Sequence, residues 1–153
     1  MTAVVIRPAE PADVGQLTET AVRSWTQAYE GVLTENAVAE APKRLRQAIA
    51  DDWRDIFVAE ARRDGIVGYF DFEPGTSHIR RIYVDPKHHR RGIGRLMIEA
   101  ALDILRDRGF SAATIDVVEG TKAPAFHRAL GWREVARAES RDGVFVISMI
   151  KDL

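Results

Sequence analysis

What the sequence lacks already narrows the class of protein. Its 153 residues contain no cysteine, which excludes a disulfide scaffold, a thiolate zinc site, an iron–sulfur protein and a cysteine nucleophile. No apolar run approaches the roughly 18 residues that span a membrane, and the stretch from Met1 to Arg7 is too short and wrongly flanked for a signal peptide. We therefore expect a cytoplasmic protein with no membrane partner.

An excess of charge of one sign is also missing. The formal net charge is −1, which argues against general nucleic-acid binding. The content of 46% hydrophobic and 29% charged residues is near the globular average. A chain of this length corresponds to one domain, so we expect residues 1–153 to form a single domain.

Hydrophobic periodicity predicts the elements of the first half. The run 4–7 predicts a strand, and apolar residues three and four apart from Val14 predict an amphipathic helix to about Tyr29. A weaker helix is expected over 34–50, interrupted at Pro42. Three strands separated by turns then predict an antiparallel meander, over residues 56–59, 66–72 and 78–84.

In the second half the period changes to that of a helix. An apolar stripe from Ile93 to Leu105 predicts the clearest helix of the chain, ending at Gly109. A buried strand, a short helix and two final strands follow, over 112–118, 121–130, about 133–139 and 144–150. The order β-α-α-β-β-β-α-β-α-β-β indicates an α/β (α+β) domain with helices packed on one central sheet.

The segment between Val84 and the long helix carries the strongest indication of chemistry. Gly92 and Gly94 open the helix, whose N-terminus has unpaired amides and about half a positive charge. Glycine lets an anion approach the backbone closely, and four basic residues add charge: Lys87, Arg90, Arg91 and Arg95. This arrangement suits a pyrophosphate. The alternative is that the glycines form only a tight turn and the basic residues form a solvated surface. The dinucleotide and Walker A patterns both fail.

Two spaced motifs resemble the GNAT superfamily of acetyl-CoA-dependent N-acetyltransferases. One is Ile82-Tyr83-Val84-Asp85-Pro86 followed by His89-Arg90-Arg91-Gly92-Ile93-Gly94, and the other runs from Gly120 to Trp132. A third similarity, to one bacterial branch, covers residues 25–31. The resemblance implies a GNAT-like fold, with a central mixed, mostly antiparallel sheet of about seven strands flanked by about four helices. It also implies acetyl-CoA as the cofactor and CoA as a product.

The resemblance further implies how the cofactor would bind. The pyrophosphate would lie against the amides of His89, Arg90, Arg91, Gly92, Ile93, Gly94 and Arg95. Backbone groups of Ile82, Tyr83 and Val84 would pair with the pantetheine arm as an added strand does. The slot for this arm would lie between the strand ending at Val84 and the strand that contains Asp116.

Several positions depart from the family pattern. His127 stands where a tyrosine is frequent, Gly120 where an asparagine is frequent, and His78 where one branch has a glutamate on the strand. An alkylamine, with a pKa near ~10.4, needs a base before it can attack, and a leaving thiolate with a pKa near ~8.5 gains modestly from an acid. His127 and His78 are therefore the catalytic candidates. The alternatives are that both serve packing, or that they form a metal pair.

The acceptor pocket is expected to involve Trp25, Tyr29, Asp71 and Phe72, with the carboxylate meeting a cationic amine; core packing of the aromatic residues is the alternative. Without a cysteine to carry the acyl group, transfer from acetyl-CoA to a primary amine would occur by direct attack in a ternary complex. The acceptor would be a small-molecule or peptide amine. A non-catalytic CoA-binding regulatory module is the rival interpretation, and a homodimer through the C-terminal strands is left open.

Overall fold

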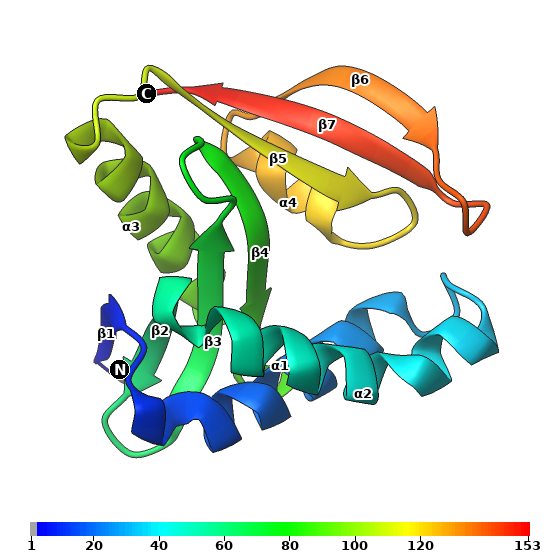
Figure 1. Ribbon diagram of the computed structural model, residues 1–153. Coiled ribbons are helices and arrows are strands. Elements are labelled where there is room, and N and C mark those ends of the chain that lie inside the picture. The colour runs from blue at the N-terminus through cyan, green and yellow to red at the C-terminus, as the bar shows by residue number, and fades with distance from the viewer. Residues whose placement is uncertain (1–2) are drawn as a thin grey trace.

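The computed structural model describes residues 3–153 as a seven-stranded sheet with helices on both faces (Figure 1). The element order is the one that the periodicity predicts. The strands are β1 (Val4–Pro8), β2 (Ile56–Ala61), β3 (Gly65–Phe72), β4 (His78–Val84), β5 (Ala112–Val118), β6 (Arg133–Glu139) and β7 (Phe145–Asp152). The α-helices are α1 (Val14–Tyr29), α2 (Glu35–Asp52), α3 (Ile93–Asp107) and α4 (Ala123–Ala129).

The sheet divides between β4 and β5. The spatial order is β1-β2-β3-β4-β5-β7-β6, and every neighbouring pair is antiparallel except β4 and β5. These two strands pair only where His78 meets Thr114 and Ile79 meets Ile115. Beyond Ile79 they diverge, and the two halves of the sheet open as a V (Figure 1). A mixed, mostly antiparallel sheet with a slot at this point is what the resemblance implies.

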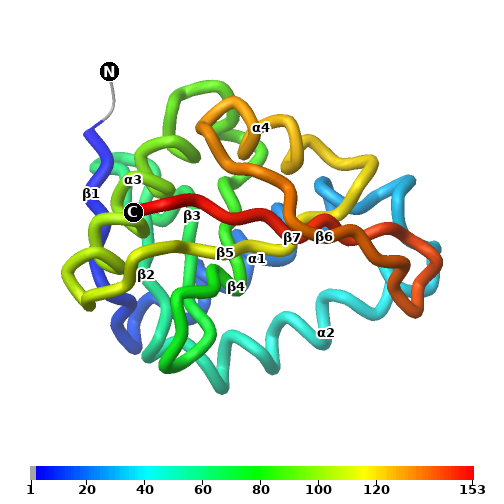
Figure 2. Tube along the Cα trace, turned by 90° about the horizontal axis from the view of Figure 1, so that it is seen from above, coloured from blue at the N-terminus to red at the C-terminus, as the bar shows by residue number. Residues whose placement is uncertain are grey.

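Two hydrophobic clusters hold helices on opposite faces of the sheet. The larger one joins α3 to alternate residues of both halves, including Val67, Ile79 and Ile115. The smaller one joins α1 to the opposite face of β3 through Leu17 and Tyr69. Seen from above, α4 and α2 lie on opposite sides of β5 and β7 (Figure 2).

The expected interruption at Pro42 is wrong. Helix α2 continues through Pro42 to Asp52. A proline in a helix removes one hydrogen bond, but Ala41, Leu45 and Ile49 are buried at helical spacing on one side of α2. Burial of this stripe outweighs the local defect, as tertiary packing often does over intrinsic propensity. Within residues 3–153 no helix combines the length and the apolar character needed to cross a bilayer.

Candidate functional site

The loop before α3 is built to present backbone amides. Arg90 and Gly92 both adopt left-handed conformations, with φ of 65° and 75°. The amide of Leu96 makes the first bond of the helix, to the carbonyl of Gly92 at 3.1 Å. The amides of the three preceding residues, Ile93, Gly94 and Arg95, therefore have no partner within the helix. They point out of a helix N-terminus, where an anion is favoured.

An ion pair fixes the start of this loop to α1. The Asp85 carboxylate accepts hydrogen bonds from the Lys87 amide at 3.1 Å and from the Arg23 guanidinium at 2.6 Å. Burial alone would raise the pKa of Asp85, but Arg23 and the Lys87 amide outweigh it and hold that pKa below its usual range. The loop therefore starts from a charged, anchored residue rather than from a flexible end.

The two glycines of the loop differ in what surrounds them. A Cβ on Gly92 would meet nothing within 4 Å, so its requirement is the left-handed backbone. A Cβ on Gly94 would lie 3.2 Å from Cζ of Phe126 and 3.7 Å from Cγ2 of Val84. Gly94 thus leaves room both for an approaching anion and for a ring of α4.

The strand that leads into this loop has an unpaired edge. Because the amide of Asp85 bonds to the carbonyl of Val67 on β3, strand alternation turns the backbone groups of Val84 and Ile82 towards the slot. Nε2 of His89 donates to the carbonyl of Val84 at 3.0 Å. The predicted pairing edge is therefore present, and His89 meets it through its side chain.

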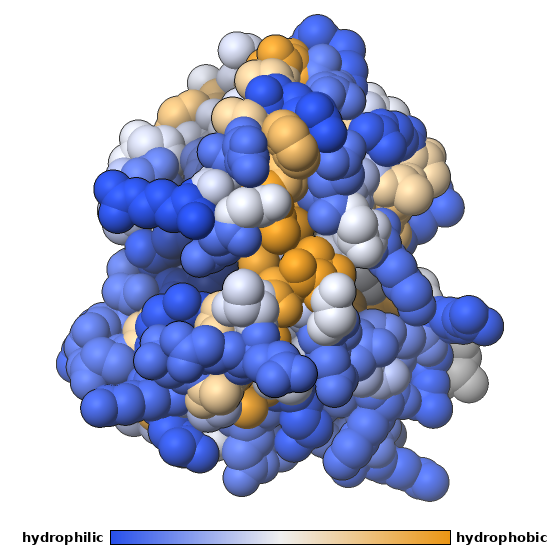
Figure 3. All heavy atoms as spheres, turned by 90° about the vertical axis from the view of Figure 1, so that its right-hand side faces the viewer, coloured by the Kyte–Doolittle hydropathy of each residue, from blue (hydrophilic) through white to orange (hydrophobic). Residues whose placement is uncertain are grey.

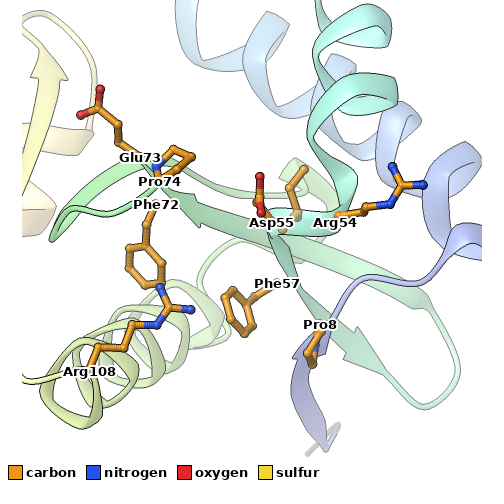
Figure 4. Close-up of a pocket in the computed structure, with 9 residues that line it drawn as sticks. Pro8, Arg54, Asp55, Phe57, Phe72, Glu73, Pro74 and Arg108 are labelled. Atoms are coloured by element: carbon orange, nitrogen blue, oxygen red, sulfur yellow. The ribbon is translucent and has the colours of Figure 1, made fainter.

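Two cavities flank α3 at its opposite ends. The larger, about 640 Å³, lies beside the N-terminus of α3 and is lined by His88, Arg91, Gly92 and Leu96 among others. The smaller, about 130 Å³, lies at the other end of the helix, where Phe57 and Phe72 form its floor and Arg108 extends over Phe72 (Figure 4). The larger one touches Ile93 at the start of the helix, but its other walls include Val4, Ala61 and Asp64, so it lies on the β1–β2 side of α3 rather than along the edge of β4.

His127 is buried in α4 on the face that carries α3. Its Nδ1 donates to the carbonyl of Ala123 at 2.8 Å, and its ring packs edge-on against Phe126 and Trp132. Nε2 is buried and has no hydrogen-bond partner among the described residues. Burial lowers the pKa of His127, and the bond to Ala123 offsets only part of this effect. The neutral ring therefore presents a lone pair rather than a proton.

His78 lies at the vertex of the V, on the face away from α3. Its Nδ1 is 2.8 Å from Oγ1 of Thr114, and its Nε2 is 3.6 Å from Oδ2 of Asp116. Oδ1 of Asp116 accepts a hydrogen bond from Ser148 on β7 at 2.7 Å. The two histidines therefore lie on opposite faces, and among the residues that the structure describes no hydrogen bond or ion pair joins them.

Aromatic residues of α1 border the slot on the same face as His78. The rings of Trp25 and Tyr29 pack at a tilt of 53° with their centroids 4.7 Å apart, and the Tyr29 hydroxyl is 3.1 Å from the hydroxyl of Tyr83 on β4. Burial is the largest cause that raises the pKa of Tyr83, followed by the neighbouring tyrosines, so its hydroxyl stays protonated. Trp25 and Tyr29 thus remain candidates for the acceptor side.

Asp71 and Phe72 do not join them, contrary to expectation. Asp71 is fully buried and bonded by the guanidinium groups of Arg80, at 2.6 Å, and Arg81. Its charge is already matched, which leaves none for a cationic amine. Phe72 is 4% exposed and belongs to the cluster on the α3 face. A shift in the register between β3 and β4 after Asp71 accompanies this placement.

The hollow between the two halves is apolar. Viewed from the right-hand side of Figure 1, hydrophobic side chains gather between the upper and lower parts of the molecule (Figure 3). The α1–α2 loop approaches the β5–α4 loop here, because Cγ1 of Val32 lies 3.8 Å from the position of a Cβ on Gly120. A Cβ at this distance would be in ordinary contact with Val32, so Gly120 is required by its φ of 91° rather than by lack of space.

The candidate residues proposed from sequence omitted Thr114 and Ser148 and gave Asp116 no role. Asp116 carries a signal, since it interrupts an otherwise apolar strand. Its partners become visible only with the pairing, in which Asp116 lies opposite Ser148 on β7 and Thr114 lies opposite His78 on β4. Strand order determines both pairs, and one sequence does not show it.

Comparison with known proteins agrees with this geometry. A family model described as the acetyltransferase (GNAT) domain matches residues 24–153. The aminoglycoside N(6')-acetyltransferase type 1 of Stenotrophomonas maltophilia is 31% identical over 149 residues, 89% of this chain and 90% of that protein. The uncharacterised N-acetyltransferase YuaI of Bacillus subtilis is 23% identical over 87% of this chain and 82% of its own. The crystal structure of the PaiA N-acetyltransferase of Thermoplasma acidophilum in complex with coenzyme A superposes with a TM-score of 0.77, at 18% identity and 99% coverage of both chains.

Proposed function

Because the chain belongs to the GNAT family of acetyltransferases, we propose that it transfers the acetyl group of acetyl-CoA to a primary amine by direct attack in a ternary complex. The chain is an acyltransferase, and acetyl-CoA is the acyl donor of its family. The acceptor class and the residues that act on it are our proposal. The observation that carries it is the unpaired edge of β4 next to the free amides of α3.

Acetyl-CoA fits the groups at this edge. The amides of Ile93, Gly94 and Arg95 would hold the pyrophosphate, together with the loop residues His89, Arg90, Arg91 and Gly92. The backbone groups of Ile82 and Val84, which face the slot, would pair with the pantetheine arm as a peptide adds to a sheet edge, while Tyr83 between them lies opposite Tyr69 of β3. The ring of His89 donates a hydrogen bond to the carbonyl of Val84, so we expect this ring to move aside when the pantetheine arm pairs there.

The acyl donor and the amine acceptor would then enter the slot from opposite faces of the sheet. The free amides belong to α3 on one face, whereas His78, Trp25 and Tyr29 border the slot on the other. An amine on that second face would reach the thioester at the vertex, where β4 and β5 begin to diverge. A backbone amide that the edge of β4 turns towards the slot would polarise the thioester oxygen. Holding the two reactants in this way accounts for much of the rate, because positioning alone contributes several kcal/mol.

Of the two histidines, His78 is the one we assign to the acceptor amine. His127 lies on the face of α3 and presents an unprotonated Nε2, which is unsuited to giving a proton to a thiolate. Substituting phenylalanine for His127 tests this assignment. Under it, the transfer rate between pH 6 and 9 is retained, whereas a large loss of rate would make His127 the acid.

The experiment that tests the proposed function is calorimetric titration with acetyl-CoA and with CoA, followed by transfer assays on a panel of primary amines. Micromolar binding of both is expected, with acetylation of at least one amine. The panel would include an aminoglycoside, linear diamines of increasing length and short peptides with a free N-terminus. Absence of acetyl-CoA binding by folded protein free of copurified CoA would refute the proposal.

A further inference from the structure

We propose that Asp116 binds the ammonium group of the acceptor and delivers it to Nε2 of His78, with Ser148 as the residue that positions the carboxylate. This inference rests on the proposed function and adds the residues that select a cationic acceptor. Three strands contribute to the arrangement: His78 comes from β4, Asp116 from β5 and Ser148 from β7.

His78 and Asp116 lie on the face of the sheet opposite α3. Ala113, Ile115 and Val117 of β5 are buried in the cluster that carries α3. Alternation along the strand turns Asp116 to the opposite face. Its side chain is 51% exposed and that of His78 is 25% exposed, so an incoming molecule can reach both.

The two ring nitrogens of His78 differ in their hydrogen-bond partners. Nδ1 has an oxygen acceptor at hydrogen-bond distance, Oγ1 of Thr114 at 2.8 Å. Nε2 does not, because 3.6 Å to Asp116 exceeds a hydrogen bond. The Thr114 hydroxyl accepts from Nδ1 in one tautomer and donates to it in the other. The proposal uses the tautomer with the proton on Nδ1, in which an ammonium group lies between the Nε2 lone pair and the Asp116 carboxylate and relieves their repulsion. Two acceptors side by side are complementary to a group with several N–H donors, and a primary ammonium is such a group.

Few charged groups surround His78 and Asp116. Arg80, two residues along β4, is bonded to Asp71, and Glu73 meets His78 through its backbone amide. Thr114 and Ser148 are neutral. Asp116 is the charged group that lies within 4 Å of the imidazole among the residues that the structure describes. Its negative charge is held in place by the Ser148 hydroxyl and is not matched by an arginine.

The chemical step then balances. One N–H bond of the ammonium breaks and its proton moves to Nε2, which frees the lone pair of the amine. That pair forms a bond to the thioester carbon, and the C–S bond breaks with its electrons on sulfur. The second proton of the amine ends on the CoA sulfur, the third stays on the amide, and Nε2 returns its proton to water.

Binding of an ammonium probe tests the pair without knowledge of the acceptor. The protein saturated with CoA is titrated with n-butylammonium chloride while the histidine ring protons are followed by NMR, with H78Q identifying the His78 signals. The His78 signals should shift to saturation in the wild type, whereas n-butanol, of similar size and without charge, should leave them unmoved. In D116N the apparent Kd should rise at least about tenfold.

Matched variants separate positioning from a general effect of charge. D142N removes an exposed acid in the β6–β7 turn and should bind the probe as the wild type does. S148A should weaken binding several-fold, and S148T, which keeps the hydroxyl, should restore it. Equal affinity in D116N and wild type, or no response of His78 in the wild type, would overturn the proposal.

Kinetics with an amine found in the panel gives a second test. D116N should raise the KM for the amine, and H78Q should lower kcat with a smaller change in that KM. Neither substitution touches Ile82, Val84 or the α3 amides, so the affinity for acetyl-CoA should stay as in the wild type. Absence of acetyl-CoA binding by the wild type would refute the proposed function, while the ammonium titration, repeated on the protein without CoA, would still report on the pair.

Discussion

The ring of Phe126 lies against the backbone of Gly94, with its Cζ 3.2 Å from where a Cβ on that glycine would be. This contact joins the short helix α4 to the first turn of α3, at the point where the free amides point outward. Phe126 is 37% exposed, so its ring borders solvent on the other side. The absence of a side chain at Gly94 therefore leaves space for two groups, the ring of Phe126 and the ligand that the amides would hold.

Replacing Gly94 with valine should separate these two roles. The larger side chain fills the space in front of the amides, so we expect acetyl-CoA affinity to fall at least about tenfold, roughly 1.4 kcal/mol, by calorimetry. The double variant G94V/F126A removes the ring and should not restore affinity, because the pyrophosphate would still be blocked. Full recovery in the double variant would show that Gly94 serves Phe126 alone. Unchanged far-UV circular dichroism would confirm that both variants are folded.

Replacing Gly68 of β3 with alanine should destabilise the fold itself. A Cβ there would lie 2.7 Å from Sδ of Met97 and 2.9 Å from the backbone oxygen of Tyr83. Methionine can move but a paired strand cannot, so we expect a loss of about 1–3 kcal/mol in the free energy of unfolding, measured with urea. Gly15 is the matched control, since a Cβ there meets nothing within 4 Å. Gly15→Ala should stabilise helix α1 slightly, and equal losses in the two variants would contradict the packing argument.

The Asp85–Arg23 pair predicts a specific dependence of stability on pH. The pKa of Asp85 is lowered in the folded protein, so the pair stabilises the fold above the unfolded pKa of about 3.9 and its contribution is lost as pH falls through the lower folded value. Asp85→Asn keeps an acceptor for the Lys87 amide and removes the charge. At pH 7 we expect it to cost about 1–2 kcal/mol, since Arg23 is partly screened by solvent.

The measurement is the urea midpoint of both proteins at pH 7 and below pH 4. The difference between wild type and Asp85→Asn should shrink as Asp85 of the wild type becomes protonated. A difference that stays constant over this range would mean that the effect of the variant is one of shape, not of charge.

The conformation of the loop before α3 could be predicted from sequence because its determinants are local. Two glycines before an apolar stripe require only neighbouring residues, and Gly92 has the positive φ that its position demands. The acceptor face depends instead on strand pairing. Asp71 was expected to meet the amine, but Arg80 and Arg81 from the next strand neutralise it. Asp116 meets His78 through a parallel pair of only two residue positions, which no local pattern shows.

His127 predicts a pH dependence in a higher range. Burial lowers its pKa, and the buried Nε2 has no partner among the described residues. The unfolded chain therefore binds a proton more readily, so stability falls as pH decreases through the unfolded pKa of about 6.5 and levels off below the folded pKa. His127→Phe keeps a ring between Phe126 and Trp132 and cannot bind a proton. It loses the hydrogen bond to Ala123, which costs about 1 kcal/mol at pH 8.

The stability of His127→Phe relative to the wild type should consequently rise as pH falls. Thermal unfolding of both proteins at pH 8, 7, 6 and 5 measures this, and the Tm of the wild type should decrease more steeply than that of His127→Phe between pH 7 and 5. The cause is the cost of charging a buried ring that, among the described residues, has one carbonyl as its polar contact. Parallel curves over that interval would mean that water or a ligand group reaches Nε2 in solution, and His127 would then return to consideration as a proton donor to CoA.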